Sequence, residues 1–66
     1  MQITVKQARI GINATQREIA EKMNIHEQTY MKLEREPETM TIKQSRQFAD
    51  IVGLSFEDIF FGNDSN

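Results

Sequence analysis

Apolar residues in this chain recur three or four positions apart over most of its length, which is the spacing of one face of an α-helix. The β-branched residues do not alternate with polar ones in the way that a half-buried strand requires. We therefore expect several helices that share one apolar core. The positions predicted to face that core are Ile19, Ala20, Met23, Ile25, Tyr30, Leu33, Ile42, Phe48, Ala49, Val52, Leu54, Phe56 and Ile59.

Helix starts are marked by one repeated polar pattern, a Ser or Thr followed three positions later by a side chain that can reach back to it. In such a capping box the two residues satisfy each other's free backbone N–H groups. Capping boxes are predicted at Thr4 with Gln7, Thr15 with Glu18 and Thr41 with Gln44, and a looser version at Ser55 with Asp58. Four starts in so short a chain predict helices joined by short connections.

Helix ends are marked by residues that tolerate the left-handed backbone conformation. Asn13, Asn24 and Gly53 each follow a helical run, and Asn and Gly are the residues that adopt this conformation most readily. Pro37 excludes helix from the acidic stretch around it. Together with the starts, these signals predict helices over residues 4–12, 15–23, 26–35, 41–52 and 55–61. The predicted fold class is all-α, a compact five-helix bundle.

The predicted bundle forms a single domain over residues 1–61, followed by a frayed polar tail at residues 62–66. Cysteine is absent and His26 is the only histidine, so disulfides, thiolate zinc sites and histidine clusters are excluded. We expect no cofactor, metal or small-molecule ligand. No apolar run reaches the ~20 residues that span a bilayer, and the first residues lack the pattern of a signal peptide. We expect a soluble cytoplasmic protein with no membrane partner.

The formal net charge of -2 is unevenly distributed. Residues 1–35 carry six Lys and Arg side chains against four Glu, whereas residues 36–66 carry two basic side chains against six acidic ones. Contacts with nucleic-acid phosphates need Lys and Arg. We therefore expect the first half of the chain to face any polyanionic partner, and the second half to face solvent or another protein.

The most informative segment covers residues 15–35. Ala20 permits two helices to approach closely, Asn24 lets the chain reverse, and Ile25 provides an apolar plug for the turn. Two helices joined in this way cross steeply, so that the second projects outward. The ordered set resembles the Cro/cI-type helix-turn-helix family, the xenobiotic-response-element-like domain of phage repressors. The matching residues are Thr15, Gln16, Ile19 to Met23, Ile25, Thr29, Lys32 to Glu34, Phe48, Ala49 and Val52 to Ser55.

The resemblance extends over almost the whole chain and implies a lambda-repressor-like fold with the helix-turn-helix at the second and third helices. It also implies a homodimer on double-stranded operator DNA, with the third helix in the major groove. By the same resemblance, Arg9 and Glu34 form a structural ion pair. The DNA-binding residues that it implies, with the outward side of the third helix, are Gln16, Arg17, His26, Glu27, Gln28, Met31, Lys32 and Lys43.

Individual roles follow from side-chain chemistry. Gln28 can pair bidentately with adenine, and Lys32 can donate to guanine or to a phosphate. Glu27 can accept from the amino group of cytosine, and Met31 can contact a thymine methyl group. His26 stands at an N-cap where relatives usually carry Ser or Thr, which weakens the helix start by about 1 kcal/mol.

We predict a sequence-specific DNA-binding regulator of transcription, either a repressor or a Cro-like switch protein from a bacterium or a bacteriophage. The alternative is a protein-interaction module, such as an antirepressor that binds a cognate repressor, because the second half is acidic and Glu27 lies on the reading face. A related alternative is an antitoxin, although these chains usually carry a longer tail.

An enzyme is not expected, because the sequence has no nucleophile with a matching base, no Gly-rich phosphate loop and no metal-ligand spacing. For every exposed polar residue the simpler interpretation is a solvated helix face. Phe60 and Phe61 are adjacent and cannot both point inward, so one of them is a candidate for a dimer surface.

Overall fold

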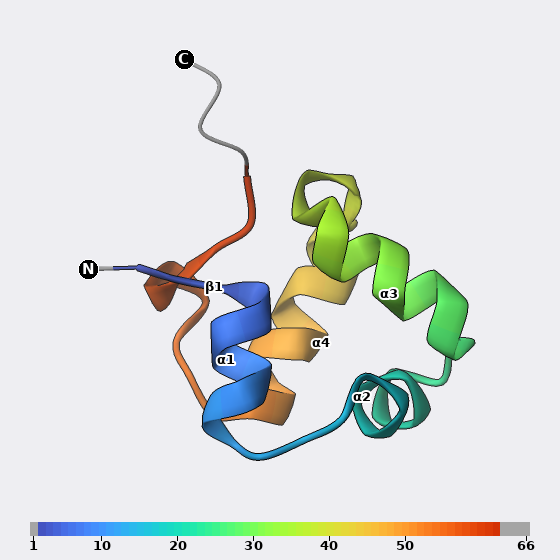
Figure 1. Ribbon diagram of the computed structural model, residues 1–66. Helices are drawn as coiled ribbons and strands as arrows, with labels where there is room; N and C mark the ends of the chain where they lie inside the picture. Colours follow the sequence, from blue (N-terminus) through green and yellow to red (C-terminus); the bar gives the residue numbers. More distant parts are fainter. Residues whose placement is uncertain (1, 63–66) are drawn as a thin grey trace.

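The structure is a computed structural model that describes residues 2–62 (Figure 1). It is a mostly helical domain with a two-stranded sheet at the chain ends. The elements in chain order are β1 (Ile3–Thr4), α1 (Val5–Gly11), α2 (Gln16–Met23), α3 (Glu27–Arg35), the 3-10 turn η1 (Pro37–Thr39), α4 (Ile42–Val52), the 3-10 turn η2 (Phe56–Asp58) and β2 (Ile59–Phe60). α2 packs against α3 and α4, and α1 packs against α4.

The predicted helix starts are confirmed at three of the four positions. Thr4, Thr15 and Thr41 each form a complete capping box, with both reciprocal hydrogen bonds present. His26 is the N-cap of α3, but its side chain makes no capping hydrogen bond. Three of the four long helices therefore begin at residues whose side chains replace the missing backbone acceptors.

The predicted helix ends are also confirmed. Asn24 ends α2 with a φ angle of 59°, and Gly53 ends α4 with a φ angle of 74°, both in the left-handed region. Asn13, with a φ angle of 58°, turns the chain between α1 and α2. These residues allow the abrupt reversals that bring successive helices against each other.

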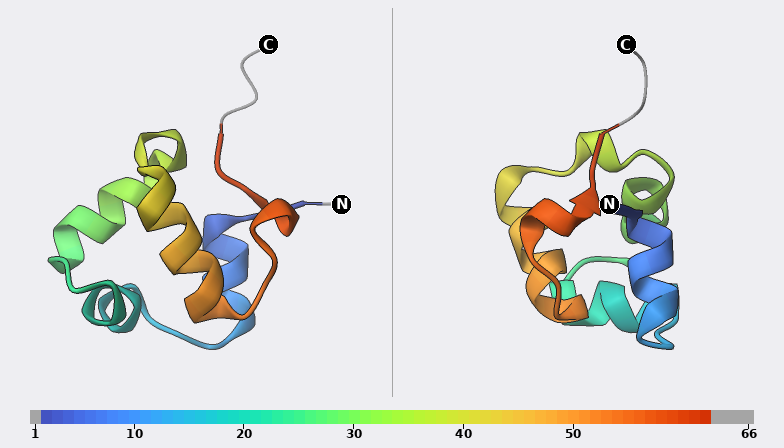
Figure 2. Two further views of the ribbon diagram at one scale, coloured as in Figure 1. Left: turned by 180° about the vertical axis from the view of Figure 1, so that it is seen from behind. Right: turned by 90° about the vertical axis from the view of Figure 1, so that its left-hand side faces the viewer.

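The fifth helix predicted over residues 55–61 is wrong. Ser55 donates its hydroxyl hydrogen bond to Glu57 Oε1 at 3.0 Å and makes no capping bond, and the backbone closes only the short turn η2. β2 then pairs in parallel with β1, in the register Ile3 to Ile59 and Thr4 to Phe60. This pairing satisfies backbone groups that a longer helix would otherwise have satisfied. The fold is therefore four α-helices with a small parallel sheet (Figure 2).

The core lies between the helices and beneath β2. Its most deeply buried large side chains are Val5, Ile19, Tyr30, Phe48 and Ile59. Two expected core residues are on the surface instead, because Ile42 is 68% exposed and Leu54 is 37% exposed. Ile42 is the first residue of α4, and the inward position one turn later is taken by Ser45, which is buried and donates its hydroxyl to the Ile42 carbonyl at 2.9 Å.

Aromatic side chains fill the part of the core near the chain ends. The ring of Phe48 lies 6.3 Å from that of Tyr30 and 6.3 Å from that of Phe61, and Phe61 also stacks on Phe56 at 5.1 Å. Such offset and edge-to-face pairs add to the gain from burial. Phe61 packs against the core, whereas Phe60 is partly buried and is not among the residues packed there, so the two adjacent rings do not both point inward, as expected. Of the predicted tail, only Gly62 is among the described residues.

Within residues 2–62, no helix combines the length and the apolar character needed to cross a bilayer.

Candidate nucleic-acid interface

The candidate interface is built on α2 and α3 and the turn between them. After Asn24 the backbone N–H of Ile25 donates to the carbonyl of Ala20 at 3.0 Å, which closes the turn. Ala20 is fully buried, as expected for the small residue that lets the two helices approach. The turn is therefore short, because only residues 24–26 lie between the end of α2 and the start of α3 at Glu27.

α3 has one buried face and one exposed face. Tyr30 and Leu33 are buried, and the side chain of Glu34 is 6% exposed. The residues of this helix that are expected to contact DNA lie on the surface instead. Met31, for example, is 38% exposed. These exposed residues are His26, Glu27, Gln28, Met31 and Lys32. A side chain that reads a base edge must stand clear of the protein interior, and each of these does.

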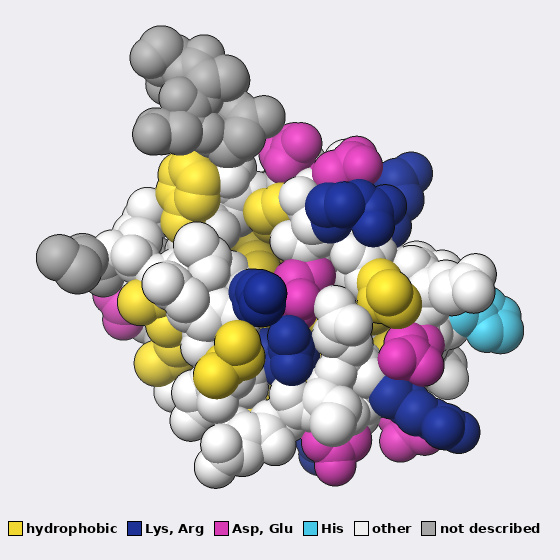
Figure 3. Space-filling view, viewed as in Figure 1, with side chains coloured by type: hydrophobic (Ala, Val, Ile, Leu, Met, Phe, Trp, Pro, Cys, Tyr) yellow, Lys and Arg dark blue, Asp and Glu magenta, His cyan; other side chains and the backbone are white. Residues whose placement is uncertain are grey.

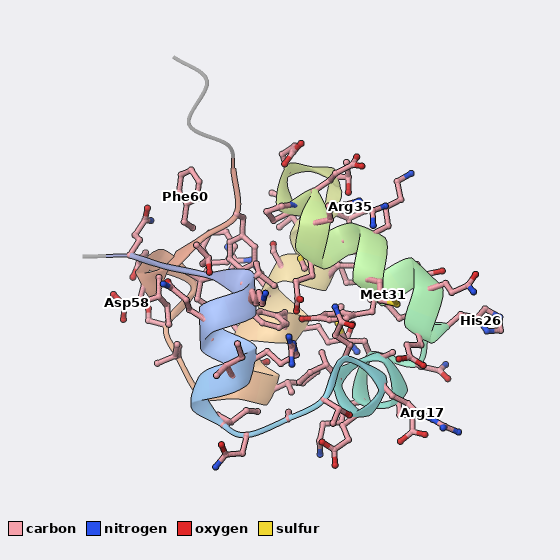
Figure 4. The ribbon with its side chains drawn as sticks, in the orientation of Figure 1. Arg17, His26, Met31, Arg35, Asp58 and Phe60 are labelled. Atoms are coloured by element: carbon pink, nitrogen blue, oxygen red, sulfur yellow. The ribbon has the colours of Figure 1, made fainter. Side chains whose placement is uncertain are left out.

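Two of the expected contact residues lie outside α3 and are exposed to solvent. Arg17 is exposed at the start of α2, and Lys43 is exposed near the start of α4. Figure 4 labels Arg17, Met31 and Arg35 on the side formed by α2 and α3, whereas Asp58 and Phe60 lie on the opposite side. The α2–α3 side of the molecule, which carries the exposed Arg17 and Met31, is thus separate from the sheet at the chain ends.

Glu34 accepts four hydrogen bonds from three other residues. Arg9 donates from Nε to Oε1 at 2.7 Å and from Nη2 to Oε2 at 3.3 Å. Tyr30 Oη donates to Oε1 at 2.8 Å, and Gln16 Nε2 donates to Oε2 at 2.9 Å. Arg9 Nη1 also donates to the Ala14 carbonyl at 2.8 Å. The cluster connects α1, the loop after it, α2 and α3.

The cluster fixes the protonation states of its members. Burial alone raises the pKa of Glu34, but hydrogen bonds from Arg9, Tyr30 and Gln16 outweigh burial and hold its pKa below the ordinary value of 4.5. Burial and the bond to Glu34 raise the pKa of Tyr30 well above its ordinary value. The hydrogen bond to Glu34 likewise raises the pKa of Arg9. At neutral pH, Glu34 is a carboxylate and Tyr30 a neutral donor.

Gln16, one of the DNA-binding residues that the resemblance implies, is partly buried, and its side chain donates a hydrogen bond to Glu34. The Tyr30–Glu34 bond joins residues four positions apart on one helix and was within reach of sequence reasoning. The Gln16–Glu34 bond was not, because it depends on how closely α2 approaches α3.

The remaining ion pairs of the described residues are weak. Arg17 Nε lies 3.7 Å from Glu21, and Arg35 Nε lies 3.8 Å from Glu36, with all four side chains substantially exposed. Exposed pairs of this kind contribute about 0–1 kcal/mol. Both guanidinium groups can therefore leave these partners for a more strongly charged anion.

Among residues 2–62, no group of three or more His, Cys, Asp or Glu side chains is arranged to hold a metal ion. What this side of the molecule offers is a set of exposed hydrogen-bonding and cationic side chains around one helix. No family model, curated protein or solved structure matches this chain.

Proposed function

We propose that this chain is a sequence-specific DNA-binding regulator of transcription, a repressor or Cro-like switch protein, that inserts α3 into the major groove of operator DNA. The observation that supports the proposal is the exposed face of α3, on which Gln28, Met31 and Lys32 stand opposite the buried Tyr30 and Leu33. The major groove of B-DNA is about 12 Å wide and admits an α-helix.

In this proposal the α3 side chains read base edges. Gln28 pairs with adenine through its amide, and Glu27 accepts from the amino group of cytosine. Met31 contacts a thymine methyl group, and Lys32 donates to guanine or to a phosphate. His26, at the N-cap, contacts the DNA backbone beside the groove.

Residues on the flanking helices position the domain on the phosphates. Arg17 at the start of α2 and Lys43 near the start of α4 supply positive charge, which carries affinity but no sequence information. The protein acts as a homodimer in the cytoplasm of a bacterium or a phage-infected host. Two copies then meet half-sites about one DNA turn apart, ~34 Å.

A fluorescence-polarisation titration tests the proposal. Labelled duplexes that tile the DNA around the chain's own gene are compared with a scrambled duplex of equal length and composition, between about 50 and 200 mM salt. We expect one duplex to bind more tightly than the scrambled one, with affinity falling as salt rises. Absence of binding to every duplex at the lowest salt would remove the proposal.

A second candidate function is binding of a repressor's DNA-reading surface by this domain. Its support is the acidic character near α3: Glu27 is exposed on the proposed reading face, and Glu38 is exposed in η1. Size-exclusion chromatography with the repressor encoded nearest to this chain's gene distinguishes the two. A stable complex of the two proteins without DNA affinity favours this second function.

A further inference from the structure

Met31 is the only exposed methionine within residues 2–62. Its side chain lies on α3 and is 38% exposed, whereas Met23 is 4% exposed in the core and Met40 is partly buried against the core. Figure 3 shows a hydrophobic patch over the middle of α3 with polar and charged side chains around it, and Figure 4 labels Met31 there. Because peroxides oxidise a thioether that they can reach, Met31 is open to an oxidant from which the other two are shielded.

Met31 also borders a surface hollow where α1, α2 and α3 meet. The other residues that line this hollow are Lys6, Gln16, Glu34 and Arg35. Its volume is about 280 Å³, whereas one water molecule occupies ~30 Å³ in the liquid. The hollow is therefore large enough to admit a molecule of hydrogen peroxide beside the thioether.

The hollow offers hydrogen-bond donors to an oxygen atom placed on the sulfur of Met31. Lys6 is exposed and belongs to none of the ion pairs within residues 2–62, and Arg35 has only its 3.8 Å contact with Glu36. Gln16 Nε2 gives one N–H to Glu34 at 2.9 Å, and its second N–H stays available to another acceptor. A sulfoxide oxygen carries partial negative charge, so cationic donors of this kind stabilise it.

We propose that Met31 is a reversible oxidation site, at which hydrogen peroxide converts the thioether to a sulfoxide and thereby weakens the binding of α3 to DNA. The sulfur attacks one peroxide oxygen, and the S–O bond forms as the O–O bond breaks. The leaving hydroxide takes the proton of the transferred oxygen and departs as water. The sulfur is thus oxidised by two electrons and the peroxide is reduced. Lys6 and Arg35 stabilise the negative charge that develops on the leaving oxygen.

The effect on DNA rests on the proposed function, in which Met31 contacts a thymine methyl group. A sulfoxide is polar, so it cannot replace this apolar contact, and hydrogen bonds to Lys6 and Arg35 draw the oxidised side chain toward the hollow. We expect affinity to fall by about fourfold or more, since fourfold corresponds to one methyl-sized apolar contact. Methionine sulfoxide reductases, one for each sulfoxide epimer, reverse the change.

The chemical arm of the test follows oxidation of the folded chain by hydrogen peroxide, with each methionine resolved by tandem mass spectrometry. We expect Met31 to be oxidised several-fold faster than Met40. Lys6→Gln and Arg35→Gln should slow the oxidation of Met31, because they remove donors from the hollow. Arg17→Gln is the matched control and should not slow it, since Arg17 is exposed but does not line the hollow.

The DNA arm measures affinity by fluorescence polarisation before peroxide, after peroxide, and after treatment with both reductases. Met31→Leu keeps an apolar side chain of similar volume and retains the other three methionines. We expect it to bind DNA like the native chain and to be insensitive to peroxide. Met40→Leu is the control and should lose about fourfold in affinity, as the native chain does. The reductases should restore the affinity of both.

The inference is overturned if Met40 is oxidised as fast as Met31, or if peroxide weakens DNA binding by Met31→Leu as much as by the native chain. Equal oxidation rates in Lys6→Gln, Arg35→Gln and Arg17→Gln also count against it, because the hollow then does not act on the sulfur. DNA binding that is unchanged once Met31 is oxidised overturns the inference and leaves the proposed function intact. Selective oxidation of Met31 in a chain that binds no duplex removes the proposed function and supports Met31 as an oxidation site.

Discussion

At the scale of single residues, the carboxylate of Glu34 holds three helices together. It lies on α3 and receives hydrogen bonds from Arg9 on α1 and Gln16 on α2, as well as from Tyr30 one turn away. Its side chain is 6% exposed, so the carboxylate has few alternatives to these donors. Within residues 2–62, no buried side-chain nitrogen or oxygen lacks a hydrogen-bond partner. The cluster is thus a satisfied polar network rather than a strained one.

Removal of Arg9 from this network should be costly. Arg9→Met leaves the carboxylate of Glu34 buried without its cation, and we expect the free energy of unfolding to fall by about 3 kcal/mol in urea denaturation. Arg17→Met is the control, because Arg17 pairs with Glu21 on the exposed surface and should cost less than about 1 kcal/mol. Adding Glu34→Gln to Arg9→Met should restore part of the loss. Equal costs for the two arginines would contradict a structural role for the pair.

The same carboxylate predicts a pH dependence. Its pKa in the folded protein lies below the ordinary value of 4.5, so the ionised form favours the folded state. This contribution is fully present above the unfolded value and is lost as pH falls through the lower folded value. We expect the difference in unfolding free energy between the native chain and Glu34→Gln to shrink on acidification below about pH 4. A difference that stays constant over this range would show that Glu34 does not titrate in this way.

On the exposed face of α3, two neighbouring changes should separate base reading from phosphate binding. Gln28→Ala should lose about 1–3 kcal/mol of discrimination at one base pair, because the bidentate amide contact is gone. Lys32→Ala should weaken binding to all duplexes if its partner is a phosphate, with a shallower salt dependence. Affinities for a set of single-base operator variants measure both effects. If neither change alters affinity or base preference, α3 is not the reading element.

At the scale of elements, most of the fold follows from signals that lie within a few residues of each other. The capping boxes and the left-handed residues define α1, α2 and α4, and helical spacing identifies the outward residues of α3. The strands were missed because β1 and β2 have only two residues each and pair across nearly the whole chain. No local pattern marks such a pairing, and the same holds for the bond between Gln16 and Glu34.

The turn between α2 and α3 can be tested at Asn24. Its φ angle of 59° costs a residue with an ordinary side chain about 1–2 kcal/mol, whereas glycine adopts it freely. Asn24→Ala should therefore lower the thermal midpoint, and Asn24→Gly should leave it nearly unchanged. Circular dichroism melts measure both variants. An equal fall in the thermal midpoint of both variants would show that the side chain of Asn24, rather than its backbone conformation, stabilises this turn.

At the scale of the whole molecule, a chain of 66 residues buries only a small hydrophobic core, so each buried side chain contributes a large share of its stability. A domain of this size is expected to be stable by only about 3–10 kcal/mol. The parallel strands bring the first and last described segments together, and the side chain of Ile59 extends the core beneath them. In this way the sheet completes a core that four helices alone leave open at one end.

This role of the sheet predicts a large difference between two identical substitutions. Ile59→Ala removes a side chain that is 2% exposed, and we expect a loss of about 3 kcal/mol in the free energy of unfolding. Ile42→Ala removes one that is 68% exposed, at the start of α4, and should change stability by less than about 0.5 kcal/mol. Urea denaturation at neutral pH compares the two. A chain carrying Ile59→Ala that is unfolded before urea is added fits the same expectation, because the loss then exceeds the total stability. Similar stabilities for the two variants would mean that the helices hold together without the sheet.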